Sequence, residues 1–120
     1  AARDVHRPAL QHLMATCFAH HGIAALLFPT TLVPATPIGA DRSVTINGVD
    51  VPFGTAIGRN ILPGSTAGLP GLVIPCGRAN GLPVSLELDG PAGSDRQLLA
   101  IGMAIAALLP TVTAASLAGS

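Results

Sequence analysis

The sequence predicts an α/β fold, in which helices pack against a sheet of short apolar strands. Apolar residues recur with helical spacing near the start of the chain (8–21), and a strongly apolar helix is expected near its end (94–109). Between them lie three short apolar runs bounded by Gly or Pro (23–28, 71–76 and 83–88), which is the pattern of largely buried strands. Both patterns within 120 residues are typical of one α/β unit with a modest core.

The first helix carries one apolar stripe. Pro8 suits its first turn, where the missing N–H removes no hydrogen bond, and Gly22 suits the left-handed residue that follows the last turn. The apolar residues recur at i, i+3, i+4, i+7 and i+8, which places them on one face of a helix; they are Leu10, Leu13, Met14, Cys17 and Phe18.

A buried strand is expected at 23–28 (IAALLF), because this run is apolar throughout and too short for a typical helix. Three prolines follow within 29–39 (PTTLVPATPIG). Because proline fixes φ and donates no backbone hydrogen bond, this segment is expected to be an ordered but irregular loop. Loops that leave strand ends in α/β proteins often line functional sites.

A β-hairpin is expected at 44–51 (VTINGVDV). Its Asn47-Gly48 pair lies between two alternating arms, and both residues tolerate positive φ. The next segment, 53–62 (FGTAIGRNIL), leaves a short helix and a loop both open. Small residues dominate 64–68 and predict a close approach between backbone elements.

Two further strands are expected at 71–76 (GLVIPC) and 83–88 (PVSLEL). The connection between them contains Asn80-Gly81 and permits an antiparallel pair. Pro75 cannot donate to a hydrogen-bond ladder, so it is expected to lie on an edge strand or at a strand end.

The last helix is expected to begin at Ser94. Ser94 and Gln97 match a capping box, in which each side chain bonds a backbone N–H of the other residue, and Asp95 suits the positive helix N-terminus. The run at 98–109 is apolar on every face, so this helix is expected to be buried on most sides. Pro110 is expected to stop it.

The composition predicts burial against other protein, either a partner or the rest of a longer chain. Apolar residues make up 49% of the chain and charged residues only 10%, with no net charge, whereas an average domain is about 25% charged. Membrane association is the alternative, but the longest apolar run (98–109) falls short of the roughly 20 residues that a spanning helix needs. The arginines are scattered without interleaved aromatic residues, so no nucleic-acid site is expected.

The residues alone point to no catalytic or metal site. Cys76 lies in a Pro-Cys-Gly segment, but all four histidines lie in the first helix and nothing brings one to this thiol. His20 and His21 are adjacent, so on a helix they point about 100° apart, which does not suit a shared metal ion. Cys17 and Cys76 fit no metal spacing and are expected to be small buried thiols in a reducing compartment.

Three acidic residues lie close together in the sequence, and paired carboxylates can serve general acid–base catalysis. Structural roles are favoured instead: Glu87 as the charge partner of an arginine, Asp89 as a turn residue and Asp95 as a helix N-terminal charge. On its strand Glu87 shares one face with Ser85, and the apolar residues occupy the other face.

Several motifs stand in a fixed order: an apolar strand ending in Pro-Thr (26–30), an Asn-to-Pro segment rich in small residues (60–70), Pro-Cys-Gly (75–77), Gly-Leu-Pro-Val with an alternating strand (81–88), and Asp followed by Leu-Leu (95–99). This series, over about residues 5–109, resembles the C-terminal region of the amidase signature family, whose members hydrolyse carboxamides. The phrase GLPVSLELDGPAGSDRQLLAIG is particularly similar to amidases that act on arylacetamides, such as the mandelamide and indoleacetamide hydrolases.

The resemblance implies part of a mixed-sheet α/β/α sandwich, with 1–110 as a C-terminal segment of an amidase domain and 111–120 as a flexible tail. It implies hydrolysis by a lysine and two serines, with no cofactor and no metal. The family's Gly/Ser-rich segment lies upstream of this region, and the chain contains no lysine. No catalytic residue is therefore carried over, and whether the chain is an enzyme by itself is left open, with inactivity expected.

The resemblance also implies partners and a place for the substrate. Expected partners are the remainder of a longer amidase chain or a complementary subunit, and a small-molecule amide in the cytoplasm; a homo-oligomer is left open. By position, the substrate pocket is expected to include Thr30, Phe53, Ile57 and Leu62, with core packing as the alternative for the last three. Two other functions stay open: a non-catalytic domain that binds a protein partner through its apolar surface, and an unrelated small enzyme that uses Cys76 or a serine.

Overall fold

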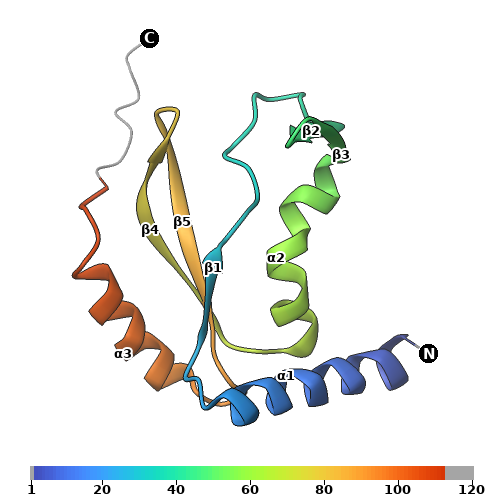
Figure 1. Ribbon diagram of the computed structural model, residues 1–120, viewed down its shortest axis with the longest axis vertical. Helices are drawn as coiled ribbons and strands as arrows, with labels where there is room; N and C mark the ends of the chain where they lie inside the picture. The colour runs from blue at the N-terminus through green and yellow to red at the C-terminus, as the bar shows by residue number, and fades with distance from the viewer. Residues whose placement is uncertain (1, 113–120) are drawn as a thin grey trace.

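The computed structural model describes residues 2–112. In chain order its elements are a short π-helix (Ala2–His6), α1 (Arg7–His21), β1 (Leu26–Pro29), β2 (Ser43–Ile46), β3 (Val49–Pro52), α2 (Phe53–Ala67), β4 (Gly71–Ala79), β5 (Leu82–Asp89) and α3 (Asp95–Ala106). A three-stranded sheet lies between α3 on one side and α2 on the other, and α1 runs across one end of the sheet (Figure 1). This arrangement confirms the predicted α/β class.

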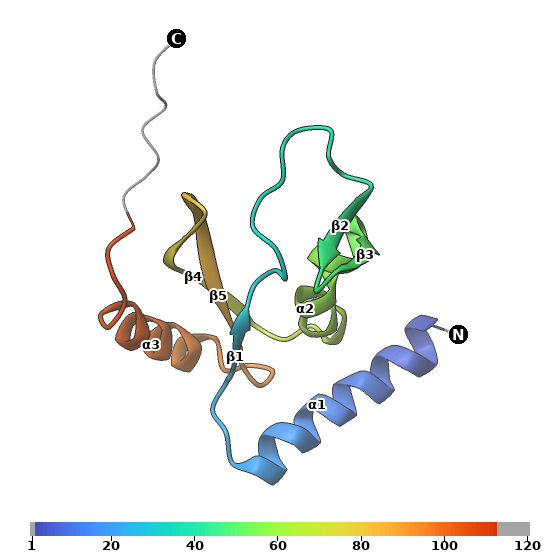
Figure 2. The ribbon, with the colours of Figure 1, turned by 45° about the horizontal axis from the view of Figure 1, so that its top comes forward.

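The first helix begins and ends where the sequence predicts. Pro8 lies in the first turn of α1, and Gly22 ends the helix with a left-handed backbone (φ 60°), its N–H donating to the Phe18 carbonyl. The N–H of Ile23 also reaches this carbonyl, at 3.3 Å. Because Gly22 and Ile23 form the end of the helix, β1 begins at Leu26 rather than at residue 23. The first turns of α1 project away from the rest of the described chain (Figure 2).

The sheet has the order β1-β5-β4, and both pairs are antiparallel. The predicted turn at Asn80-Gly81 is confirmed, since both residues adopt positive φ (51° and 79°) between β4 and β5. Pro75 lies on β4, an edge strand of this sheet, as predicted, and the register shifts between Pro75 and Gly77. Both strands are longer than expected because the ladder continues up to the turn.

Residues 53–62, for which the sequence left a helix and a loop both open, form the first part of α2. The hairpin that precedes α2, made of β2 and β3, turns at Asn47-Gly48 with positive φ at both residues (51° and 79°), which confirms that prediction. The N–H of Phe53 donates to the carbonyl of Arg42 at 3.0 Å, so the hairpin leads directly into α2. Pro63 lies within the helix.

The hydrophobic core lies between the sheet and α3. Ile74, Leu88 and Leu98 form its centre, and Leu72 and Ile101 pack against them. These side chains come from β4, β5 and α3, so the alternation predicted for β5 delivers its apolar face to α3.

The last helix, α3, starts after Ser94 as predicted, but the prediction of a capping box is wrong. The Ser94 side chain makes no capping hydrogen bond, and its buried Oγ has no partner among the described residues. The backbone of Ser94 (φ −89°, ψ 19°) is not in the extended conformation of a side-chain cap. Its carbonyl instead accepts the Leu98 N–H at 2.8 Å. The helix ends at Ala106, and turns follow it to Leu109.

The prediction that α3 is buried on most sides is wrong for this chain. Leu98 and Gly102 are its buried residues, whereas Leu99 and Met103 are 55% and 76% exposed. Only one flank of α3 meets the sheet, so its other apolar side chains face outward.

Within residues 2–112 no helix is long and apolar enough to cross a membrane. The predicted tail at 111–120 lies outside the described residues from position 113 onward.

Candidate functional site

Two carboxylates are buried side by side on the sheet face opposite the core. Glu87 and Asp89, here named the acidic pair, alternate with Leu88 along β5, so they share the face turned toward α2. A spacing of two residues along a strand places their α-carbons about 7 Å apart. Glu87 is 8% exposed and Asp89 4% exposed. Glu87 was expected to pair with an arginine and Asp89 to be a turn residue, so their joint burial is the main feature that sequence reasoning missed.

The acidic pair is closely surrounded by two glycines. A β-carbon added to Gly64 of α2 would overlap the carboxylate of Asp89. A β-carbon on Gly71 of β4 would lie 3.1 Å from Oδ1 of Asp89 and 3.6 Å from Oε1 of Glu87. The close approach predicted at 64–68 is therefore confirmed, and it encloses the end of β5.

Burial controls the electrostatics of the acidic pair. It raises the pKa of Glu87 above the ordinary value of 4.5, and the charge of Asp89 adds to this rise. It also raises the pKa of Asp89 above 3.8. Because both groups bind protons more readily in the folded chain, the stability that they contribute is lost as pH rises through their folded-state pKa values.

One oxygen of the acidic pair has no partner. The Oε2 atom of Glu87 is buried and accepts no hydrogen bond within residues 2–112. The arginine partner expected for Glu87 is therefore not found in this part of the chain. The turn role expected for Asp89 is also wrong, because Asp89 pairs with Leu26 and Gly71 as the last residue of β5. The N-terminal position expected for Asp95 is confirmed, since it is the first residue of α3.

Of the four predicted substrate residues, Phe53 and Ile57 lie on one face of α2, and Thr30 follows β1 near this helix. Thr30 follows β1, and its N–H and Oγ1 donate to the Ser85 carbonyl at 3.2 and 3.4 Å. Asn60 of α2 donates from Nδ2 to the Pro29 carbonyl at 2.7 Å. Phe53 and Ile57 lie about two turns and one turn before Asn60, on the same helical face.

Leu62 does not join this group. It lies two residues beyond Asn60, on the opposite side of α2, and is 57% exposed. The structure therefore places Phe53 and Ile57 on the face of α2 that bears Asn60, whose side chain reaches Pro29 next to Thr30, and it separates Leu62 from that face. Substrate contact by any of the four stays a prediction.

An apolar cavity of about 610 Å³ lies elsewhere, between α1, the end of α2 and the segment after β5. Gln11 borders it and donates from Nε2 to the Ala67 carbonyl at 2.8 Å, which ties α1 to α2. Its size is typical of small-molecule sites, yet it contains none of the predicted substrate residues. Sequence reasoning missed it because its lining comes from distant segments, including Phe18, Leu69 and Pro91.

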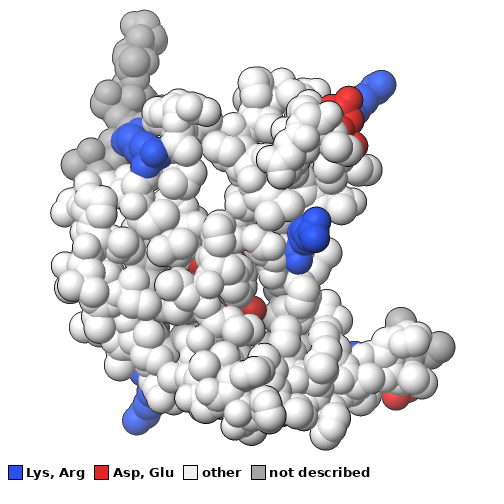
Figure 3. Space-filling view, viewed as in Figure 1, with Lys and Arg blue, Asp and Glu red and all other residues white. Residues whose placement is uncertain are grey.

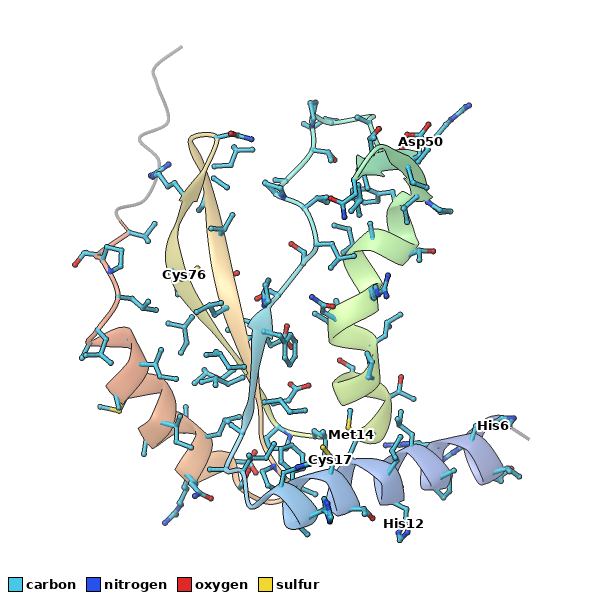
Figure 4. The ribbon with its side chains drawn as sticks, in the orientation of Figure 1. His6, His12, Met14, Cys17, Asp50 and Cys76 are labelled. Carbon is cyan, nitrogen blue, oxygen red and sulfur yellow. The ribbon has the colours of Figure 1, made fainter. Side chains whose placement is uncertain are left out.

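The structure does not support a cysteine–histidine site. Cys76 lies on β4, and its thiol faces the Val84 carbonyl at 3.5 Å. Figure 4 shows His6 at the end of the π-helix and His12 on α1, both well away from Cys76. Cys17 and Cys76 are free and half-buried rather than buried as expected. Among the described residues no three His, Cys, Asp or Glu side chains form a group that could hold a metal ion.

The molecular surface is hollowed between the β4–β5 hairpin and the half that contains β2, β3 and α2 (Figure 3). Acidic atoms are visible low in this hollow, and the other charged residues are scattered over the surface.

The profile of a protein family described as Amidase matches residues 1–99.

The chain belongs to the amidase family.

Relatives of this amidase chain support the predicted resemblance. It is 47% identical to an indoleacetamide hydrolase from Agrobacterium vitis over 105 residues, which cover 87% of this chain and 22% of that protein. It is 37% identical to a mandelamide hydrolase from Pseudomonas putida over 112 residues, covering 89% of this chain and 21% of that protein. The amidase chain thus spans about a fifth of the length of these relatives.

A solved structure described as an amidase superposes on this chain with a TM-score of 0.79 and 33% identity. The superposition covers 87% of this chain and 23% of that one. The predicted family and the predicted α/β architecture are therefore confirmed for this amidase chain, which corresponds to part of a longer fold.

Gly64→Ala is expected to destabilise this amidase chain by about 1–3 kcal/mol, because the new methyl group overlaps the Asp89 carboxylate and packed interiors tolerate added atoms poorly. Gly54→Ala is the matched control in the same helix, where a β-carbon meets nothing within 4 Å. It is expected to change the free energy of unfolding by no more than about 0.5 kcal/mol, because Gly54 lies exposed in the first turn of α2. Urea unfolding of both variants measures the difference, and equal effects would refute the close approach of α2 to β5.

Proposed function

We propose that this chain is the C-terminal part of an amidase that hydrolyses an arylacetamide-type carboxamide to a carboxylate and ammonia. The observation that carries the proposal is the 47% identity to an indoleacetamide hydrolase over 105 residues. Similarity to a mandelamide hydrolase at 37% identity supports the same substrate class. Both substrates are amides of arylacetic acids, so a carboxamide next to an aryl-bearing carbon is their common chemistry.

The proposed reaction takes its catalytic residues from outside these 120 residues. A serine nucleophile attacks the amide carbon, a lysine acting through a second serine moves the protons, and ammonia leaves as the acyl-enzyme forms. Water then hydrolyses the acyl-enzyme and releases the carboxylate. The absence of lysine from the chain supports an external source for this machinery.

In this proposal the chain contributes to the pocket and to the scaffold. The proposed substrate-binding residues are Thr30, Phe53, Ile57 and Leu62. Phe53 and Ile57 share one face of α2, and Thr30 follows β1 near this helix. Apolar side chains at Phe53 and Ile57 suit an aryl group. The hydroxyl of Thr30 donates to the Ser85 carbonyl, so its acceptor lone pairs are the part that can meet the substrate.

The proposed main partner is the remainder of a longer amidase chain or a complementary subunit. The exposed apolar face of α3, with Leu99 and Met103, supports a covering partner, because large apolar patches on soluble proteins usually mark interfaces. A cytoplasmic location and hydrolysis without a cofactor or metal belong to the same proposal, which leaves a homo-oligomer open.

A hybrid enzyme tests this function. In the Agrobacterium vitis indoleacetamide hydrolase, the segment that matches this chain is replaced by this chain. The hybrid is expected to release ammonia from indoleacetamide and mandelamide faster than from a short alkyl amide, since the graft carries the proposed pocket residues. Ammonia release is compared with the unchanged enzyme and with the enzyme that lacks the segment. A hybrid that folds and hydrolyses none of these amides would overturn the proposal.

A further inference from the structure

Within residues 2–112 the structure shows no counter-charge paired with the acidic pair. Oε2 of Glu87 is buried and has no hydrogen-bond partner in residues 2–112. Arg59 is the charged residue of α2, the helix packed beside the pair, and it is exposed. The chain contains no lysine. Buried carboxylates in proteins are normally paired and hydrogen-bonded, because isolated burial of a charge is costly.

The sheet face that bears the acidic pair is covered only in part. Gly64 of α2 lies over Asp89, which closes that end of β5. Val73, directly opposite Glu87 on β4, shares the same face and is 50% exposed. A side chain from another segment can therefore approach Glu87 over Val73, from the side that α2 does not cover.

We propose that the acidic pair binds a lysine or arginine side chain from the part of the longer amidase that lies outside these 120 residues. The proposal rests on the proposed function, because it requires that longer chain. The α-carbons of the two residues lie about 7 Å apart on one strand, so a cation that contacts Glu87 also feels the charge of Asp89. A protein about five times longer has ample chain to supply it, since this segment spans 22% of its relative. The ion pair would lock the segment against the rest of the enzyme.

Glu87→Gln in the hybrid enzyme is the direct test. Glutamine keeps the shape and the hydrogen-bond acceptor of Glu87 but removes the charge, so a neutral donor would still be satisfied and a cation would not. With a basic partner, the urea midpoint of the hybrid is expected to fall by about 1 M, since breaking a buried ion pair is strongly destabilising. Asp41→Asn, which removes an exposed loop carboxylate, is the control and is expected to leave the midpoint unchanged.

An unchanged or raised midpoint for Glu87→Gln would overturn the inference, because it would mean that the acidic pair is neutral or has no cationic partner. If the Glu87→Gln hybrid does not fold, Asp89→Asn on the same face replaces it, with the same two outcomes. The measurement reports unfolding rather than hydrolysis. A hybrid that folds without activity would therefore refute the proposed function, while the urea midpoint would still decide the ion pair.

Discussion

Leu88→Ala is expected to lower the free energy of unfolding of the chain by about 2–5 kcal/mol, the range for leucine-to-alanine changes in well-packed cores. Leu88 is 1% exposed and packs with Ile74 and Leu98 between the sheet and α3. Alanine removes this contact and leaves a cavity that the short strands around it cannot readily fill. Because small domains are stable by only about 5–15 kcal/mol, the loss is a large part of the total.

Leu27→Ala is the matched control for this change. Leu27 lies directly opposite Leu88 in the β1–β5 ladder but is 53% exposed. The same chemical change there is expected to cost less than about 1 kcal/mol. Urea unfolding of both variants gives the comparison. Equal losses would contradict the placement of the core between β5 and α3.

The helices and strands of this chain were largely predictable where local pattern decides them. The apolar stripe before Gly22 and the two Asn-Gly turns carry their own conformational signals, and the structure confirms them. The boundary of β1 was not predictable, because the cap after Gly22 uses residues whose apolar character alone suggested a strand.

The helix α2 was harder to predict, because its sequence contains helix-weakening residues. Pro63 has no N–H to donate to the Arg59 carbonyl, and glycine disfavours helix interiors. Gly64 is nevertheless required where α2 meets Asp89. Here a tertiary contact outweighs local propensity.

The burial of the acidic pair was not predictable from one strand. Alternation along β5 correctly separated Glu87 from the apolar residues, but it does not tell which element covers the polar face. That depends on α2, far from β5 in the sequence. Phe53 and Ile57 share one face of α2, and Leu62 lies on another, because of the helical period, whereas the hydrogen bond from Asn60 to Pro29 that brings Thr30 near this helix is a tertiary contact.

We propose that this chain belongs to an amidase whose catalytic residues lie outside these 120 residues. The chain has no lysine, the thiol of Cys76 faces the Val84 carbonyl, and His6 and His12 lie well away from it. Purified alone, it is therefore expected to release no ammonia from any carboxamide, although the hybrid does. This is the largest effect that we expect, because without an activated nucleophile nothing accelerates attack on the amide.

Ammonia release by the purified 120-residue chain, tested on a panel of aryl and alkyl carboxamides, examines this claim most directly. The unchanged Agrobacterium vitis indoleacetamide hydrolase serves as the positive control for the assay. We expect release at the level of the protein-free blank for every amide. Turnover that persists through repurification and disappears in Cys76→Ala, or in a serine-to-alanine variant, would contradict it, because the chain would then hold its own nucleophile.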